Sequence, residues 1–305
     1  MLDLSIIIVN WNTRDLTAKC LSDVQATVKK IAYEIIVVDN NSSDGSQDMV
    51  RTQFPDVKLI ANKDNVGFAS ANNQGMKIST ARYILLLNSD AFVKANTIDR
   101  MVAFMDEHPE AGMAGCKLLY EDGRLQASCA TFPTLATEFY IALGLDKLFP
   151  KSKIFGKYLM TDWDYSTMRE VDVIMGAFML ARKSVIDQVG MMDESFFMYS
   201  EEVDWCYRFK AAGWKILFTP EVECVHIWGG SSRAVKVETL IRLYRARVQF
   251  FRKHYGRLTA FLYKIILAFN SLVRIIPGAI YYLRSEAGRQ KHYAFRQLLG
   301  AIPGF

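Results

Sequence analysis

Four short apolar runs that alternate with stretches of helical character most constrain how this chain can fold. The apolar runs are Ser5–Val9, Glu34–Asp39, Val57–Ala61 and Tyr83–Asn88. The helical stretches between them are Leu16–Ile31, Ser46–Phe54 and Phe68–Ser79. The runs are rich in Ile, Val and Leu without clear alternation, which is typical of strands covered on both faces. Strand–helix–strand spacing of this kind predicts right-handed crossovers and a parallel sheet.

A polar cluster follows each of the four runs. The clusters are Asn10-Trp11-Asn12, Asp39–Gly45, Asn62–Gly67 and Asn88-Ser89-Asp90. In a parallel sheet the carboxyl ends of the strands meet at one edge, where ligands collect. One such cluster would be an ordinary turn, but four clusters on the same edge predict a binding site.

Beyond Asp90 the alternation fades. We expect a helix over Ile98–Glu107, strands over Met113–Leu119 and Val171–Leu180, helices over Lys183–Gln188 and Ser200–Ala212, and strands near Lys215–Phe218 and Val222–His226. Residues 126–170 are irregular and rich in aromatic side chains. A connection this long inside a domain is usually functional, so we interpret it as an acceptor-binding loop or a lid.

The net charge of +5 averages over two unlike parts of the 305 residues. Residues 237–305 contain 12 Lys and Arg side chains against only Glu238 and Glu286, so residues 1–236 have a net charge of −5. We therefore expect a mildly acidic body, 1–236, with halves 1–95 and 96–236, and a basic, apolar tail, 237–305. The five cysteines include no C-x-x-C pair and the N-terminus has no signal-peptide pattern, so a cytoplasmic body with reduced thiols is expected.

Two carboxylates end buried strands at the predicted edge. Asp39 precedes Asn40-Asn41-Ser42-Ser43, a sequence that suits an Asx turn as well as contact with a nucleotide base or ribose. Asp90 ends the Asn-Ser-Asp sequence. A carboxylate there is a poor core residue but a good oxygen ligand for Mg²⁺ or Mn²⁺ on a diphosphate. Asn88 could act only through a neutral carbonyl or a water.

Three acids, Glu201, Glu202 and Asp204, stand together at a predicted helix start after Ser200. Carboxylates at a helix N-terminus are favoured by the helix dipole, so simple capping is one interpretation. Mutual repulsion and partial burial beside aromatic residues would also raise the pKa of one of them towards that of a general base, which is the other interpretation.

His226 ends the last predicted strand and precedes a Gly-Gly-Ser-Ser-Arg segment that ends at Arg233. A lone histidine is more often structural than a ligand. The adjoining segment offers backbone N–H groups and a guanidinium that suit phosphate. Together with Asp90, His226 would form a mixed nitrogen and oxygen site for Mn²⁺ or Mg²⁺.

Six motifs in order make a specific pattern: residues 6–12, 36–46, 65–75, 86–90, 176–182 and 192–208. Any one of them is weak, but the ordered set resembles the family 2 glycosyltransferases of the GT-A fold. Within that family it is most similar to the bacterial rhamnosyltransferase-like branch, from about Ser5 to Tyr255. The resemblance implies an α/β fold with a mostly parallel central sheet flanked by helices.

The resemblance also implies roles for individual residues. Asp90 takes the place of the metal-binding carboxylate of the D-x-D motif, His226 that of the later metal ligand, and Glu202 that of the general base, with Glu201 and Asp204 beside it. The donor would be held by Asn10, Trp11, Asn12, Asp39, Asn41, Asn65, Gly67, Phe68, Asn72, Asn73, Asn88, Ser89 and Arg233. Two positions depart from the family pattern. Asn88 replaces the first Asp of D-x-D, and Glu202 replaces an Asp and so reaches one methylene further.

The implied activity is inverting transfer of a sugar from a nucleotide diphosphate to a lipid-linked saccharide acceptor in cell-surface polysaccharide synthesis. The resemblance favours dTDP-L-rhamnose as donor, with a UDP-sugar next, and Mg²⁺ or Mn²⁺ as cofactor. A non-catalytic nucleotide-sugar-binding scaffold subunit is the alternative, against which Asp90, the three acids and His226 argue. A Rossmann dehydrogenase is excluded because no G-x-G-x-x-G follows the first strand. No nucleic-acid partner is expected, and a homodimer stays open.

The tail favours a membrane surface. In residues 240–257 basic side chains gather on one helical face opposite aromatic ones, which suits either a helix packed on the body or a membrane-surface helix. Residues 258–283 are long enough to span a bilayer, but Lys264, Asn270 and Arg274 interrupt them, and each cation would cost at least ~2.5–3.5 kcal/mol at the midplane. We therefore expect an interfacial helix on the cytoplasmic face of the plasma membrane, holding the active site over its acceptor, and a span stays open.

Overall fold

The computed structural model describes residues 2–227, 237–275 and 286–305, and the chain forms two compact units. Unit 1 comprises Met1–Ala130, Tyr165–Phe197 and Glu201–Ser231, and unit 2 comprises Thr131–Asp164, Met198–Ser200 and Ser232–Phe305. The predicted boundary at residue 236 differs from this division, because residues 131–164 pack with the C-terminal helices instead of with the sheet. The predicted halves of the body, 1–95 and 96–236, share one sheet.

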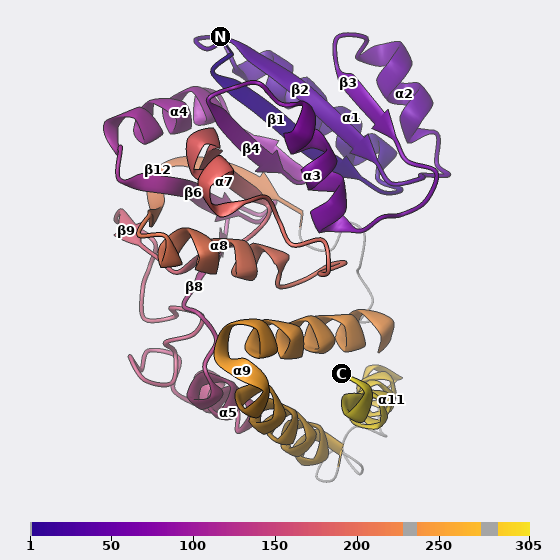
Figure 1. Cartoon of the computed structure of the whole chain (residues 1–305), viewed down its shortest axis with the longest axis vertical. Helices are drawn as coiled ribbons and strands as arrows, with labels where there is room; N and C mark the ends of the chain where they lie inside the picture. The colour runs from indigo at the N-terminus through magenta and orange to yellow at the C-terminus, as the bar shows by residue number, and fades with distance from the viewer. Residues whose placement is uncertain (1, 228–236, 276–285) are drawn as a thin grey trace. The chain divides into compact units, whose positions relative to one another are not determined.

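Unit 1 is built on a ten-stranded sheet in the order β3-β2-β1-β4-β11-β6-β12-β5, with β7 paired to β6 and β9 to β12 (Figure 1). The strands of its first half are β1 (Leu4–Asn10), β2 (Tyr33–Asp39), β3 (Lys58–Ala61), β4 (Tyr83–Leu87) and β5 (Ala91–Val93). Those of its second half are β6 (Ala111–Leu119), β7 (Leu125–Gln126), β9 (Arg169–Glu170), β11 (Phe178–Arg182) and β12 (Lys215–His226). β8 (Cys129–Ala130) and β10 (Val173–Ile174) form a separate antiparallel pair. Strands β1 to β4 are parallel as predicted, whereas β11 is antiparallel to both of its neighbours.

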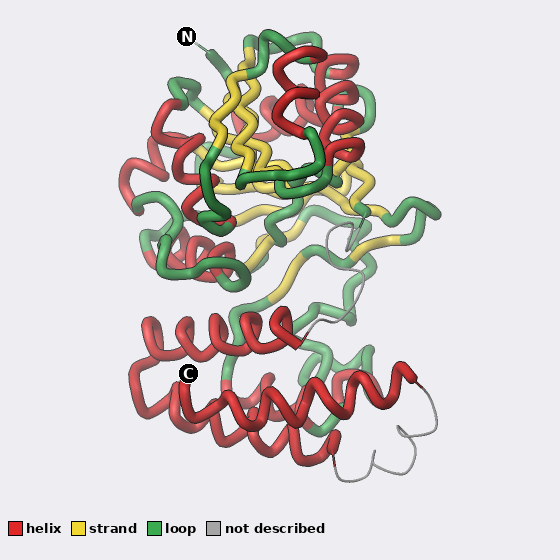
Figure 2. The backbone as a smooth tube through the Cα atoms, turned by 90° about the vertical axis from the view of Figure 1, so that its right-hand side faces the viewer, coloured by secondary structure: helices red, strands yellow, loops and turns green. Residues whose placement is uncertain are grey.

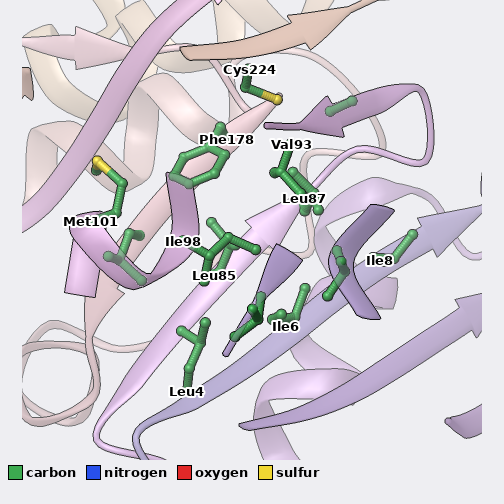
Figure 3. Packing of buried hydrophobic residues seen from close by; sticks show 14 of the residues in the cluster. Leu4, Ile6, Ile8, Leu85, Leu87, Val93, Ile98, Met101, Phe178 and Cys224 are labelled. Carbon is green, nitrogen blue, oxygen red and sulfur yellow. The ribbon is translucent and has the colours of Figure 1, made fainter. Parts of the chain in front are cut away.

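Helices cover both faces of this sheet. They are α1 (Arg14–Thr27), α2 (Ser46–Gln53), α3 (Phe68–Ile78), α4 (Thr97–Glu107), α7 (Lys183–Val189) and α8 (Glu201–Ala211). Figure 3 shows Ile6 and Ile8 of β1 beside Leu85 of β4 in the core to which α1, α2 and α4 contribute. Ile7 points to the other face, where α3 approaches so closely that a Cβ on Gly75 would lie 2.7 Å from the Ile7 side chain. Burial on both faces is the reason that β1, β2 and β4 are continuously apolar.

Three expectations for the second half differ from the structure. The strand expected over Val171–Leu180 is divided between β10 and β11. The two strands expected over 215–226 are one strand, β12, whose register shifts between Thr219 and Glu223. Pro220 lies within the shift and has no N–H to donate to the ladder. The short strand β5, which pairs with the end of β12, was not expected.

Unit 2 is helical. Its elements are α5 (Leu135–Ala142), α6 (Leu145–Leu148), α9 (Val237–Ile275), α11 (Glu286–Ala301) and the short 3₁₀ helix η1 (Ile302–Gly304). The chain breaks helical geometry inside α9 at Gly256, where φ is 87°, so α9 has two arms (Figure 1). Side chains of both arms share a core with α11 and η1, which includes Phe251, Tyr263 and Leu298. Figure 2, in which helices are red, shows the helices of this unit.

The segment expected to be an irregular loop, 126–170, therefore contains two helices. Thr134 caps α5, because its hydroxyl accepts from the Thr137 N–H and its own N–H donates to the Thr137 hydroxyl. Arg247 of α9 holds α5 from the other side through an ion pair with Glu138, at 2.9 Å between Nη1 and Oε1. Both side chains are largely buried. The predicted helices over 240–257 and at the start of 258–283 correspond to the two arms of α9, and residues 276–283 lie outside the described part of the chain.

Candidate functional site

The register of the sheet aligns the strand ends that the sequence predicts to meet. Asn10 at the end of β1 pairs with Asp39 at the end of β2, and Asp39 pairs with Ala61 at the end of β3. β4 lies on the other side of β1, with Ile7 opposite Leu86. The polar clusters that follow β1, β2, β3 and β4 therefore share one edge of unit 1.

Asn10 and Asp39 form a buried hydrogen-bonded pair at this edge. The Asn10 Nδ2 donates to Asp39 Oδ2 at 2.6 Å. Asp39 Oδ1 accepts from the Ser42 N–H at 2.9 Å and from Gln47 Nε2 at 2.7 Å. A carboxylate has about four acceptor positions, so three intrachain donors leave about one for a ligand. The Asx-turn interpretation of Asp39 is therefore present in the structure, and a contact with a ribose or base stays a prediction.

The segments after β1 and β2 are joined to each other. Asn12 and Asn41 both have positive φ values, 54° and 62°. The Asn12 N–H donates to the Ser42 hydroxyl, and Asn12 Oδ1 accepts from the Ser43 N–H at 2.8 Å. Trp11 between them is 49% exposed, so about half of this large aromatic side chain is accessible to a ligand.

The start of α3 makes a close approach that only glycine permits. Gly67 has a φ of 87°, and a Cβ on it would lie 2.4 Å from the carbonyl oxygen of Phe197. The Phe68 N–H donates to that same carbonyl oxygen at 2.8 Å, and Asn65 Oδ1 accepts from the Gly67 N–H. This contact holds the segment that leads into α8 against the start of α3.

Asn72 and Asn73 use their amides inside the protein. Asn72 Nδ2 donates to the Phe68 carbonyl oxygen at 3.0 Å. Asn73 Nδ2 donates to the Met192 carbonyl oxygen and to Glu194, and its Oδ1 accepts from the Met192 N–H. Both side chains are almost fully buried. This geometry favours a structural role for these two residues, instead of the predicted place in a donor pocket.

The structure brings Asp90 and His226 together. His226 pairs with Ala91 in the β12–β5 ladder, and the Ile227 N–H donates to the Asp90 carbonyl oxygen. As a result His226 Nε2 lies 3.2 Å from Asp90 Oδ1. Asn88 Nδ2 lies 3.4 Å from the same ring nitrogen. Ser89, between Asn88 and Asp90, is hydrogen-bonded through its hydroxyl to Thr13 at 2.9 Å.

Gln126 was not predicted, and it fixes the orientation of His226. Its Oε1 lies 2.7 Å from His226 Nδ1, and its Nε2 donates to the His226 backbone carbonyl oxygen at 3.4 Å. An amide oxygen only accepts, so the proton of a neutral His226 ring is on Nδ1 and the Nε2 lone pair is turned toward Asp90. Gln126 stands in β7 after Gly-Arg-Leu, and nothing in that short sequence distinguishes it from an ordinary hairpin residue.

His226 Nε2 faces the Asp90 carboxylate oxygen at 3.2 Å and Asn88 Nδ2 at 3.4 Å, an arrangement that suits a proton on the ring or a cation shared with the carboxylate. Carboxylate oxygen and imidazole nitrogen both suit Mn²⁺, and Mg²⁺ accepts the oxygen readily. Among the residues that the structure describes, no group of three or more His, Cys, Asp or Glu side chains could hold a metal ion. Two protein ligands are nevertheless the ordinary number for an ion whose other ligands are waters and substrate phosphates. The residues therefore fit the implied metal.

The three acids at the start of α8 differ in their surroundings. Asp204 is fully buried and forms an ion pair with Arg208 at 2.9 Å, and Arg208 also binds the Val189 and Met191 carbonyl oxygens. This favours a structural role for Asp204, which differs from the predicted catalytic one. Glu201 is 5% exposed and its Oε2 has no hydrogen-bond partner. Burial raises the pKa of Glu201 well above its ordinary value, and the charge of Glu202 raises it further. Glu202 is partly exposed.

Backbone strain marks the approach to these acids. Tyr199 and Ser200, the two residues before Glu201, have φ values of 73° and 64°. Consecutive left-handed residues other than glycine cost about 1–3 kcal/mol each, and such strain clusters at functional sites. Arg233, the remaining predicted donor residue, lies outside the described residues, in 228–236.

The chain is similar to several glycosyltransferases that are known by name. A 203-residue alignment relates the chain at 28% identity to the N-acetylglucosaminyl-diphospho-decaprenol L-rhamnosyltransferase of Mycobacterium tuberculosis, covering 63% of this chain and 66% of that enzyme. Rhamnosyltransferase WbbL of Escherichia coli K12 is 27% identical over 72% of this chain and 82% of its own length. The low-salt glycan biosynthesis hexosyltransferase Agl10 of Haloferax volcanii is 26% identical over 73% and 67%. The chain thus spans about two thirds of the length of the first of these relatives.

Solved structures establish the fold. The mannosyltransferase of Pyrobaculum calidifontis, solved with GDP-Man and Mn²⁺, superposes with a TM-score of 0.60 at 16% identity over 100% of this chain and 88% of its own. Residues 1–349 of Staphylococcus aureus TarS give a TM-score of 0.53 at 14% identity over 99% and 92%. The predicted GT-A fold is therefore confirmed. The family model described as Glycosyl transferase family 2 matches residues 5–207, so this chain is a glycosyltransferase that belongs to family 2.

Proposed function

We propose that this glycosyltransferase is metal-dependent and inverting, and that it moves L-rhamnose from dTDP-L-rhamnose to a lipid-linked saccharide in cell-surface polysaccharide synthesis. The observation that carries the proposal is the pairing of Asp90 with His226 at the strand edge, with Gln126 behind the ring. The names of two relatives support rhamnose, and one of those names also specifies a diphospho-decaprenol-linked acceptor. A UDP-sugar is the second choice of donor.

In this proposal Asp90 and His226 would hold a divalent cation, and Trp11 would stack on the donor base. The bound cation would neutralise negative charge that develops on the leaving diphosphate. Asn10 and Asp39 keep the edge rigid through their hydrogen bonds. The nucleotide sugar would therefore meet hydrogen-bonding groups that are already in place.

Glu202 is the proposed general base. Its carboxylate would take the proton from the acceptor hydroxyl while that oxygen attacks the anomeric carbon from the face opposite the diphosphate, so one displacement inverts the configuration. Glu201 supports this role, because burial and then the charge of Glu202 raise the pKa of Glu201, and this favours its neutral form beside a charged Glu202. The predicted catalytic contribution of Glu201 is thus electrostatic.

The test is donor turnover by the purified chain across a panel of nucleotide sugars, with Mn²⁺, with Mg²⁺ and after chelation. We expect metal-dependent release of nucleoside diphosphate that is fastest with dTDP-L-rhamnose, and a product of inverted anomeric configuration by NMR. Donor binding without any turnover in the presence of acceptor would instead support the scaffold-subunit alternative. Full activity after chelation would contradict the metal assignment.

The base assignment has its own test. Glu202→Gln removes the proton acceptor but keeps the shape of the side chain, so transfer should fall by roughly 10²–10⁴-fold while the donor Kd is unchanged. Glu107→Gln on α4 is the matched control, because Glu107 is an exposed acid bound to Arg100, away from the strand edge. Near-normal turnover by Glu202→Gln would remove Glu202 from the mechanism.

We also propose that the protein works at the cytoplasmic face of the membrane that holds its acceptor. A lipid-linked substrate requires the enzyme to reach a membrane, and the basic, apolar C-terminal region is the part of the chain suited to that contact.

A further inference from the structure

The second arm of α9 has a continuous apolar side that the protein leaves uncovered. This apolar face consists of Leu258, Phe261, Leu262, Ile265, Phe269 and Leu272, which are between 39% and 72% exposed. They are spaced three or four residues apart, so they lie on one side of the helix. At 100° per residue they fall within about 100° of one another. Large apolar side chains gathered in this way mark an interaction surface.

A second helix extends this face. Phe139 of α5 stacks on Phe269, with 6.1 Å between the ring centroids. Leu143 lies one helical turn beyond Phe139, and both residues are more than 40% exposed. The surface therefore spans two packed helices of unit 2, which is broader than the edge of a single amphipathic helix.

The opposite side of the same arm is already occupied. Ala260, Tyr263 and Leu267 are buried in the unit 2 core, and the Tyr263 ring stacks on Phe251 with 4.5 Å between centroids. Asn270 is buried on this side too, where its Oδ1 accepts from Arg274 at 2.6 Å. The buried and exposed sides are about 180° apart. The helix is apolar on both sides, and only the exposed side is left uncovered by the rest of unit 2.

Length alone does not decide whether this arm crosses a bilayer. Residues 257–275 form about 28 Å of helix, close to the thickness of the hydrocarbon layer. Among the described residues, α9 is the one helix long and apolar enough to cross a membrane, and 28% of its most apolar stretch is buried in the protein. Packing decides the question. α11 packs along α9 and carries Lys291 and Arg296 at exposed positions, so a crossing α9 would draw these cations into lipid or leave its own core.

Positive charge borders the apolar face. Arg257 and Lys264 lie seven residues apart along one margin of the face, and Lys264 Nζ also donates to the Pro303 carbonyl oxygen at 3.3 Å. Residues 237–305 contain 12 basic side chains against two acids. Cations beside an apolar helical face match a bilayer interface, where the apolar side chains enter the acyl boundary and the cations meet anionic headgroups.

We propose that unit 2 binds an anionic lipid bilayer through this apolar face, with the second arm of α9 lying in the membrane plane. The inference deepens the proposed function, because it names the surface that reaches a lipid-linked acceptor. It also decides between the interfacial helix and the span that the sequence leaves open.

Vesicle binding tests the surface. The chain should co-sediment with vesicles of phosphatidylcholine and phosphatidylglycerol, more weakly with phosphatidylcholine alone, and should be released by carbonate at high pH. The double variant Phe261→Ser with Ile265→Ser should bind roughly 10- to 100-fold more weakly, because two large apolar side chains no longer enter the acyl boundary. The matched control is Ile78→Ser with Met168→Ser, which removes two comparably exposed apolar side chains from unit 1 and should bind like the wild type.

Depth measurements test the orientation. A fluorophore on a cysteine introduced at Leu258, Ile265 or Leu272 is quenched by nitroxide-labelled lipids according to its depth. The five native cysteines are buried, and burial raises the pKa of each thiol, so the introduced cysteine is labelled selectively. An in-plane helix gives one shallow depth at all three positions. Depths that change by about 10 Å from one position to the next would show a crossing helix and overturn the proposal.

Two further outcomes are distinguishable. If the face joins two copies of the chain, the wild type sediments as a dimer, the double variant as a monomer, and neither binds vesicles, which overturns the proposal. Nucleotide-sugar turnover in vesicle-free buffer should be equal for wild type and double variant. Vesicle binding by a chain that turns over no donor would leave the surface established and the proposed function wrong.

Discussion

At the scale of single residues, one hydrogen bond fixes the orientation of the His226 ring. Gln126 Oε1 lies 2.7 Å from Nδ1, which leaves Nε2 beside Asp90. A role for His226 as a metal ligand stays a prediction. Asp90 and His226 were predicted from their positions after apolar strands. Gln126 could not be predicted, because its partner is one hundred residues away in the sequence and the contact follows from how β7 and β12 flank β6.

Gln126 should therefore act as a positioning residue for the metal ligand. Gln126→Leu keeps the volume but removes the acceptor, so Mn²⁺ affinity in the presence of nucleoside diphosphate should fall by roughly 10- to 100-fold. Gln126→Glu restores an acceptor and should keep or raise the affinity. Calorimetric titration measures the affinity, and ¹⁵N NMR of the His226 ring reports the tautomer. Unchanged affinity together with an unchanged tautomer in Gln126→Leu would show that Gln126 only fills space.

Glu201 should make stability depend on pH in a recognisable direction. Burial, then the charge of Glu202, raises the folded-state pKa of Glu201, so its stabilising contribution is complete below the ordinary glutamate pKa and is lost as pH rises through the raised value. Glu201→Gln does not titrate. Between pH 4 and pH 8 the free energy of unfolding of Glu201→Gln should rise relative to that of the wild type. The rise is about 1.4 kcal/mol for each tenfold difference in proton affinity of Glu201 between the folded and unfolded states.

Urea titrations across that pH range measure the effect. Glu107→Gln is the control of opposite sign, because the hydrogen bond from Arg100 lowers the pKa of Glu107 and its stabilisation is lost on acidification. Parallel stability curves for wild type and Glu201→Gln would mean that Glu201 titrates as an ordinary surface acid.

At the scale of elements, the sequence predicts those strands and helices whose burial gives them a recognisable apolar composition. Strands β1, β2 and β4 are buried on both faces, and their continuous Ile, Val and Leu predicted each of them within two residues of its ends. β3 was expected equally closely, but it is an edge strand in which Lys58 and Ala61 are exposed. β5 has three residues and forms by pairing with the end of β12. α5 contains Thr137, Phe139 and Tyr140, residue types that favour strands, and its helix is supported by Arg247 of α9, which binds Glu138. Short elements whose stability comes from distant partners leave little local signal.

Gly67, at the start of α3, is the element boundary where a side chain should destabilise the fold most. Gly67→Ala requires a residue with a side chain at φ 87° and places its Cβ 2.4 Å from the Phe197 carbonyl oxygen. We expect a loss of about 3 kcal/mol or more, made up of backbone strain and displacement of the segment before α8. Gly123→Ala is the matched control, because its φ is 80° with no atom within 4 Å, so it should cost only about 1 kcal/mol. Equal losses in urea unfolding would mean that the contact with Phe197 relaxes without cost.

At the scale of the whole molecule, the division by charge and the division by packing differ. The sequence places the boundary where basic residues begin, at 237, because charge is visible residue by residue. Packing assigns 131–164 to the helical unit as well, since Glu138 and Phe139 of α5 bind Arg247 and Phe269 of α9. A chain segment inserted between strands can belong to another core, and that membership depends on contacts more than a hundred residues apart.

Two separate cores predict that unit 2 can be destabilised by itself. Arg247→Met leaves Glu138 buried without its ion partner, which typically costs about 3–5 kcal/mol. Burial already raises the pKa of Glu138 despite the opposing charge of Arg247, so the charged carboxylate is poorly tolerated there. Adding Glu138→Leu to Arg247→Met removes the stranded charge and should recover most of the loss. Hydrogen exchange followed by mass spectrometry should show faster exchange in α5 and α9 of the single variant and unchanged exchange in β1 to β4. Equal acceleration in both units would mean that the two cores unfold as one.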